Sequence, residues 1–276
     1  ITCLDPIFKI VDGEISSRFM RVLCKYNMLP PGTFGFVPGG APDWAIETAA
    51  TVQWMSRRQG MTSYQYFLDA TSAYDTLSHS AVSMACHVYA IPRDVEDMLL
   101  ATITGHERLC NTAYQVGYND TRAQLHGGVA QGAPSSPTIF TFANSLAAEY
   151  SNSLSQTGFP LVPKPSSISN QVPSKRAFEA AAQEPTVKRI KLQGYADDLE
   201  SQVGGYATTT REATKLFEET GDSAGGLTVM LALNGIRLNL GKSYFQYSVQ
   251  AGHLMKHQPV LTLTALDHRG VFLRKP

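Results

Sequence analysis

Two segments far apart in the chain each place aspartate at the end of a predicted strand. Residues 64–69, YQYFLD, are compact and aromatic, which is typical of a buried strand, here ending at Asp69. Residues 192–203, LQGYADDLESQV, predict a hairpin with its turn at Asp197 and Asp198. Adjacent carboxylates repel each other, so such a pair needs either solvent or a cation. A fold for this chain must therefore explain why carboxylates end two separate strand segments.

The remaining pattern mixes helices and strands. Asp5 can cap a first helix that Pro6 opens, with apolar residues at helical spacing as far as Val22 and an end at Pro30-Pro31. Further helices are predicted at residues 42–60, 71–90, 92–105, 134–154 and from about 210, and strands within 110–130, 243–249, 259–266 and 270–274. The elements do not alternate strictly as βαβ units, which favours an α+β fold built on an antiparallel sheet.

Length and composition bound the class of protein. A chain of 276 residues can bury a core as one large domain or as two lobes. No stretch approaches the ~20 apolar residues that cross a bilayer, so we expect no membrane partner. The net charge is zero, with 23 basic and 23 acidic residues, which counts mildly against a nucleic-acid binder. The cysteines form no CxxC pair and are expected to be free, mostly buried thiols; they are Cys3, Cys24, Cys86 and Cys110.

Residues 158–187 break the helical and strand patterns. This stretch is rich in Pro, Ser and Ala, and it is predicted to be a flexible insertion outside the core. Basic pairs at Lys175-Arg176 and residues 188–191 (KRIK) resemble a bipartite nuclear localisation signal, which would place the protein in the nucleus. The alternative is a basic loop that touches nucleic acid or only solvent.

Three segments carry the candidate chemistry: FLDATSAYD at 67–75, GGVAQGAPSSP at 127–137, and YADD at 195–198. Each has a structural alternative, because a strand-end Asp often caps a helix, a Gly-Pro loop is often only a turn, and an Asp pair is often solvated. Their order is what two-metal phosphoryl transfer requires. Two cations about 4 Å apart need carboxylates from separate elements, and strand ends and hairpin tips hold such groups rigidly. Bound cations also remove the repulsion between adjacent aspartates.

At this point the sequence resembles the reverse transcriptase domain of non-LTR retrotransposons, over nearly the whole chain. The matching segments, in the family's order, are ITCLDPIFKI, LPPGTFGFVPGG, FLDATSAYDTLSH, GVAQGAPSSPTIF, GYADDLES and GIRLNLGKS. The resemblance implies a right-hand polymerase with fingers at residues 1–62 and about 83–131 and a palm at 63–82 and 132–276. It also implies that the thumb is absent and that the fragment belongs to a larger polyprotein with thumb and endonuclease parts.

The resemblance implies RNA-directed DNA synthesis by a nucleotidyltransferase that extends a DNA primer with dNTPs on an RNA template. Asp69 and Asp197 would bind two Mg²⁺ ions, with Asp198 as the third catalytic carboxylate. Mn²⁺ is the alternative ion, since hard oxygen ligands suit both.

The resemblance also implies a nucleotide-binding set. Ala70 and Tyr74 would lie at the incoming sugar, where the Tyr74 ring excludes a 2′-hydroxyl. Gln131 and Gly132 would pack against the incoming nucleotide and template. Lys242 would lie near the triphosphate and neutralise or protonate the leaving pyrophosphate.

The chain departs from the family where positive charge is usual. Val37 follows the Gly-Phe of the fingers motif, Ser72 stands where Lys is frequent, and Ala130 replaces a frequent Arg. His268 and Arg269 match the primer-grip hairpin only loosely. These differences keep open a second hypothesis, a nucleic-acid-binding remnant with weak or no catalysis, because phosphate affinity depends on such contacts.

Two further alternatives concern single residues. Asp75 could be a second catalytic acid, as in RNA-dependent RNA polymerases, or a structural residue that pairs locally; the structural interpretation is favoured. The pair His253 and His257 has helical metal-ligand spacing but lacks a third ligand nearby, so a surface pair is expected.

Overall fold

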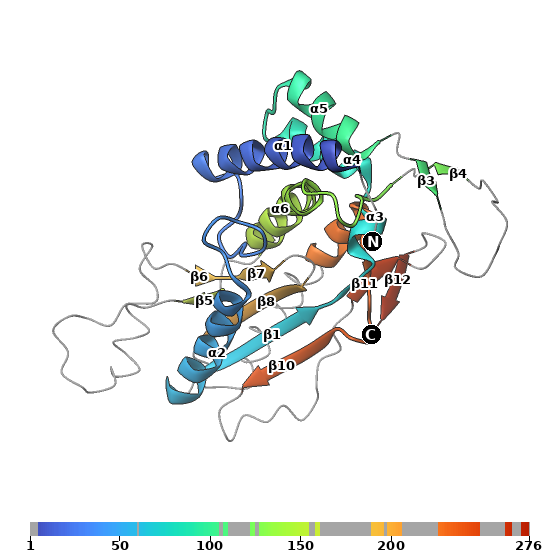
Figure 1. The fold of residues 1–276 in the computed structure, drawn as a ribbon. Helices are drawn as coiled ribbons and strands as arrows, with labels where there is room; N and C mark the ends of the chain where they lie inside the picture. The colour runs from blue at the N-terminus through green and yellow to red at the C-terminus, as the bar shows by residue number, and fades with distance from the viewer. Residues whose placement is uncertain are drawn as a thin grey trace.

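A four-stranded antiparallel sheet carries both aspartate segments (Figure 1). In this computed structural model the strand order is β10 (Tyr244–Ser248), β1 (Thr62–Leu68), β8 (Asp198–Gly205) and β7 (Leu192–Tyr195). Each neighbouring pair runs antiparallel. The predicted α+β class with an antiparallel sheet is therefore confirmed.

The structure describes residues 5–59, 61–104, 107–109, 122–124, 127–154, 158–160, 189–195, 198–205, 226–248, 263–266 and 272–275. The helices are α1 (Pro6–Lys25), α2 (Pro42–Gln59), α3 (Ala73–Thr76), α4 (His79–Val88), α5 (Arg93–Ile103) and α6 (Ser136–Leu154), and residues 226–233 are also helical. Short antiparallel pairs join β2 (Ala70–Thr71) to β9 (Arg237–Leu238), β3 (Glu107–Leu109) to β4 (Arg122–Gln124), β5 (Phe159–Pro160) to β6 (Arg189–Ile190), and β11 (Leu263–Leu266) to β12 (Phe272–Lys275).

Helix α1 begins as the sequence predicts, but only part of the predicted apolar face is buried. The Asp5 carboxylate accepts hydrogen bonds from the amides of Ile7 (2.8 Å) and Phe8 (3.3 Å), and the helix ends at Lys25, before the prolines. Apolar spacing alone favoured a face that includes Ile10, yet Ile10 is 73% exposed. The buried side chains of α1 are Asp12, Phe19, Met20 and Leu23.

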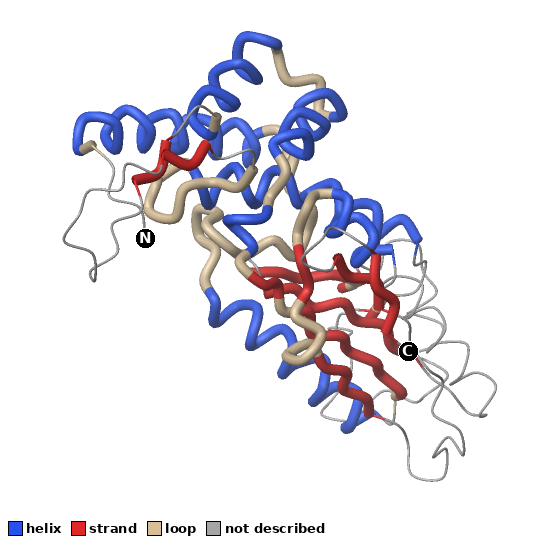
Figure 2. The backbone as a smooth tube through the Cα atoms, turned by 90° about the vertical axis from the view of Figure 1, so that its right-hand side faces the viewer, coloured by secondary structure: helices blue, strands red, loops and turns tan. Residues whose placement is uncertain are grey.

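The helices divide between the two faces of the sheet (Figure 2). Helix α2 contacts β1, β7 and β10, whereas α6 contacts β7 and packs against α1 and α4. The buried core lies on the α6 side, where Tyr66 and Leu68 of β1 join Phe140 and Phe142 of α6. Within it the Cys86 thiol is free, and burial, with Glu96 nearby, raises its pKa to about 11. That side of the sheet is the main source of hydrophobic stabilisation.

The predicted insertion at 158–187 needs a correction at its start. Phe159 is fully buried, and β5 pairs with β6, so residues 159 and 160 belong to the folded part. Residues 161–188 lie outside the described residues. The strand pair expected within 110–130 involves residues 107–109 and 122–124 instead, and residues 110–121 are likewise outside the described part. None of the described helices is long and apolar enough to span a membrane.

Candidate active site

The sheet register places Asp69 and Asp198 at the same end of neighbouring strands. Leu68, the last residue of β1, lies opposite Leu199 of β8, so the flanking aspartates face each other across the pair. Asp198 is exposed and Asp69 is partly exposed, as cation ligands must be before binding. Asp198 begins β8 and pairs with Tyr195 of β7, whereas the sequence predicted it in the turn of the hairpin. Asp197, the other predicted ligand, lies outside the described residues.

A tight turn brings Lys242 beside Asp69. The amide of Asn239 donates to the Asp69 carbonyl oxygen at 2.8 Å, and the Asp69 amide donates to Oγ of Ser243 at 3.1 Å. The Asn239 side-chain oxygen accepts from the amides of Gly241 (3.2 Å) and Lys242 (3.3 Å), which closes the turn. The NLGKS segment therefore presents an exposed ammonium next to a carboxylate on a different strand.

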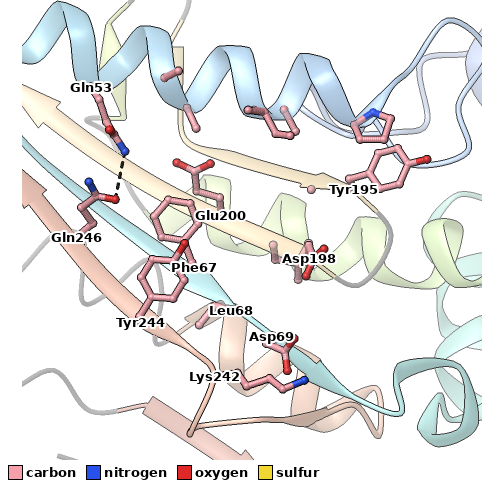
Figure 3. Close-up of a pocket in the computed structure, with 17 residues that line it drawn as sticks. Gln53, Phe67, Leu68, Asp69, Tyr195, Asp198, Glu200, Lys242, Tyr244 and Gln246 are labelled. Atoms are coloured by element: carbon pink, nitrogen blue, oxygen red, sulfur yellow. Dashed lines mark hydrogen bonds between the residues drawn. The ribbon is translucent and has the colours of Figure 1, made fainter.

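These three side chains line one cavity of about 580 Å³ between α2 and the sheet (Figure 3). Small residues of α2, among them Ala45 and Ala49, form one wall. The rings of Phe67 and Tyr244 stack on the sheet side, with centroids 4.6 Å apart. A cavity of this size, with charged groups at one end, can hold a small polar ligand.

The inner part of the cavity has polar residues that the sequence interpretation did not single out. Gln53 of α2 donates to the side-chain oxygens of Gln65 (3.0 Å) and Gln246 (3.2 Å). Gln65 in turn donates to the buried carboxylate of Glu200 at 3.0 Å and reaches the Gln202 oxygen at 3.5 Å. A signal was present for the strand residues. Gln65 lies four positions before Asp69, Glu200 and Gln202 lie two and four positions after Asp198, and alternate residues of a strand share a face.

Tyr74 and the QG loop (residues 127–135) form a second group. The amide of Val129 donates to the Tyr74 carbonyl at 2.7 Å, and that of Gly128 to the Leu77 carbonyl at 2.7 Å. Gly128 has φ +83°, and a Cβ there would lie 2.6 Å from a backbone oxygen, so this close approach requires glycine. The Tyr74 ring stacks on Phe140 of α6 at 4.9 Å, which holds it in place.

The remaining predicted nucleotide contacts flank these two groups. Ala70 pairs with Leu238 directly after Asp69. Gln131 donates to the Asp75 carboxylate at 3.3 Å, which agrees with a local structural role for Asp75, and Gly132 is exposed. Neither Tyr74 nor the QG loop lines the cavity of the carboxylates; residues 69–75 connect the two groups.

Residues 32–34 contact the hairpin that carries Asp198. The amide of Phe34 donates to the carbonyl of Gly194, and the amide of Gly194 donates to the carbonyl of Gly32, both at 2.9 Å. The ring centroids of Phe36 and Tyr195 lie 6.0 Å apart. Two motifs distant in the sequence are thus joined through backbone hydrogen bonds at the sheet edge.

The metal prediction remains a prediction. Within the described residues no cluster of three or more His, Cys, Asp or Glu side chains could hold a metal ion. The pair His253 and His257 lies outside them. Of the basic residues proposed for nuclear import, Lys191 donates to the Asn152 carbonyl at 2.7 Å, and burial lowers its pKa. Lys175 and Arg176 are outside the described residues.

Comparisons with known proteins point in one direction. No protein-family model matches the chain. The retrovirus-related Pol polyprotein from the type-1 retrotransposable element R2 of Popillia japonica is 33% identical over 87 residues, which is 31% of this chain and 14% of that protein. A truncated apo telomerase from Candida tropicalis superposes with a TM-score of 0.51 at 12% identity, over 97% of this chain and 45% of that one. The chain thus spans a small part of the curated relative. With these likenesses beside the ordered motifs, the resemblance of this chain to a retrotransposon reverse transcriptase domain is confirmed.

Proposed function

We propose that this chain is the fingers and palm of an RNA-directed DNA polymerase, which extends a primer 3′-hydroxyl with dNTPs on an RNA template. The observation that carries the proposal is the convergence of Asp69, Asp198 and Lys242, from three separate segments, on one cavity at the end of the sheet. In nucleotidyl transfer, carboxylates and a positively charged side chain act on the same phosphate groups, which lie between them. That is the arrangement proposed here.

The carboxylates fit a hard divalent cation. Asp69 and Asp198 offer accessible oxygen ligands, and Asp197 supplies a further one in sequence. Mg²⁺, or Mn²⁺ in its place, would be held by these residues and would neutralise charge on the phosphates and on the attacking oxygen. Within the protein itself, Lys242 supplies a proton or positive charge to the departing pyrophosphate, and its turn holds it on the Asp69 side.

Sugar selection is proposed for Tyr74. The ring is fixed by Phe140 and by the QG loop that bonds to its backbone, so it can act as a rigid steric wall. Such a wall excludes a 2′-hydroxyl and favours dNTPs. Gln131 and Gly132 on the same loop would contact the incoming nucleotide and template.

Primer extension on an RNA template tests this function. We expect dNTP incorporation by the purified protein with Mg²⁺, little incorporation of NTPs, and a loss of roughly a thousand-fold in rate for Asp198→Asn, or about 4 kcal/mol of transition-state stabilisation. Asp97→Asn is the matched control, because Asp97 is an exposed α5 carboxylate paired with Arg93. An Asp198→Asn variant that extends primers like the parent would refute the assignment, and exclusive use of NTPs would show that Tyr74 is not a sugar gate.

A second candidate, a nucleic-acid-binding remnant without turnover, rests on lost positive charge. Val37 packs against the core, Ser72 is an exposed residue with φ 50°, and Ala130 has no charge to offer a phosphate. RNA binding without incorporation of either nucleotide class would favour this candidate. As partners we propose RNA, a DNA primer and the other parts of a polyprotein, with the nucleus as the location.

A further inference from the structure

Asp12 is a buried carboxylate that the proposed chemistry does not use. It lies on α1, is 1% exposed, and belongs to the buried residues of that helix, as Phe19 and Met20 do. A buried charge is costly unless it is hydrogen-bonded, so its partner indicates why it is tolerated. The sequence pattern gave no reason to single it out, because a polar residue in an amphipathic helix is expected to face solvent.

The partner of Asp12 is the start of α6, far along the chain. The amide of Ser135 donates to Oδ2 of Asp12 at 2.8 Å. Ser135 is the cap residue of α6, since its carbonyl accepts the first helical hydrogen bond from Ile139 at 2.9 Å. The Asp12 carboxylate therefore lies at the positive end of a 19-residue helix, where negative charge is stabilised.

Of the remaining polar atoms at this junction, some have hydrogen-bond partners and some do not. Oδ1 of Asp12 and Oγ of Ser135 are both buried without a hydrogen-bond partner among the described residues. The Ser135 hydroxyl therefore does not cap α6. Within the described residues, the Asp12 carboxylate accepts the hydrogen bond from the Ser135 amide at the end of the loop. One turn further along α1, Ser16 Oγ lies 3.2 Å from the Pro134 carbonyl and 2.8 Å from the Thr138 hydroxyl.

The segment held in this way is the QG loop. Its other end is bonded to the Tyr74 and Leu77 carbonyls through residues 128 and 129. Gln131 and Gly132 lie between the two anchors, so their position depends on both. The second anchor comes from α1, where Asp12 and Ser16 contact residues 134 and 135.

We propose that Asp12 is a positioning residue for nucleotide binding, which acts by fixing Ser135 and with it Gln131 and Gly132. The inference rests on the proposed function, because that function assigns the loop residues to the incoming nucleotide and template. It gives α1, a helix remote from the carboxylates, a defined role in substrate affinity.

Hydrogen exchange tests the anchor without any need for activity. In Asp12→Ala we expect the amides of residues 131–133 and 135 to exchange about tenfold faster, because a hydrogen bond to a charged group is lost, while β1 and β8 stay protected. Asp12→Asn keeps the shape and one oxygen acceptor and should restore most of the protection. Glu14→Gln is the matched control on the same helix, since Glu14 is exposed and forms an ion pair with Arg18 on the surface of α1.

Kinetics test the positioning. Asp12→Ala should raise KM for dNTP by about tenfold with kcat within about twofold, because the loop binds substrate without taking part in bond formation. Asp12→Asn should lie near the parent in KM. If Asp12→Ala does not fold, Ser16→Ala should show the same changes at smaller size.

The exchange and kinetic results distinguish a failure of the positioning role from a failure of the proposed function. Unchanged loop exchange in Asp12→Ala, uniform loosening of the whole sheet, or a loosened loop with unchanged KM would each overturn the positioning role. A parent protein that incorporates no nucleotide would overturn the proposed function instead, and the exchange pattern would still decide whether Asp12 anchors the loop.

Discussion

The two faces of the central sheet differ sharply although the same strands form both. On the α6 side, β1 contributes Tyr64, Tyr66 and Leu68, all at most 4% exposed. On the α2 side it contributes Gln65 and Phe67, and Asp69 follows at the end. Alternation with a period of two lets one strand serve a hydrophobic core and a polar cavity at once.

The difference between the two faces of the sheet explains the position of the candidate site. A face rich in Gln and Glu can be covered only if its polar groups are hydrogen-bonded to each other and to the covering helix, as Gln53 and Gln65 are. Toward the strand ends that network stops, and the cavity has the exposed carboxylate of Asp198. We infer that the apolar face supplies stability and that the polar face supplies chemistry.

Neighbouring aromatic residues of β1 give the largest test of this contrast. Tyr66→Ala should lower the free energy of unfolding by about 3–5 kcal/mol, because it removes a buried ring from the core. Phe67→Ala, on the polar face, should cost clearly less, since Phe67 is only partly buried and mainly stacks on Tyr244. Urea unfolding of both variants measures the difference, and equal losses would break the assignment of stability to one face.

Alkaline pH should weaken the apolar face selectively. Burial raises the pKa of Tyr66 to about 12, so the folded state keeps a proton that the unfolded state releases above its ordinary value near 10. The contribution of Tyr66 to stability is therefore full below pH 10 and falls between pH 10 and 12, by roughly 2–3 kcal/mol. Urea titrations across that range should show the fall.

Tyr66→Phe is the control for the pH experiment, because it keeps the ring and removes the titrating hydroxyl. The fall should become shallower and not vanish, since burial also raises the pKa of Tyr89 to about 12. An unchanged slope in Tyr66→Phe would contradict the role given to Tyr66.

Local patterns predicted most of these elements. The Asp5 cap, the β1 strand and the hairpin at the aspartates follow from residues close together in the sequence, so capping and alternation were sufficient. The order of motifs indicated that Asp69 and the aspartate pair would lie together, whereas the place of Lys242 was implied only by the family resemblance.

Contacts between distant segments were not predictable in this way. The exposed side of α1 could not be told from its buried side, because which face packs depends on α6 and not on periodicity. The Gln network required the register of β1 with β8 and β10, and the Asp12–Ser135 bond required the placement of two helices. Each depends on tertiary packing, which a single helix or strand pattern does not contain.

The smallest effect is expected within the polar network, and it tests whether the polar face is held by its hydrogen bonds. Gln65→Met keeps the length of the side chain but removes the donor to Glu200 and the acceptor for Gln53. Leaving a buried carboxylate oxygen without this donor should cost about 1–3 kcal/mol of unfolding free energy. Gln246→Met is the matched control and should cost less, because Gln246 is partly exposed and loses one bond to Gln53. If Gln65→Met were as stable as the parent, apolar contacts with α2 and not hydrogen bonds would hold this face, and the two sides of the sheet would differ less than their residues indicate.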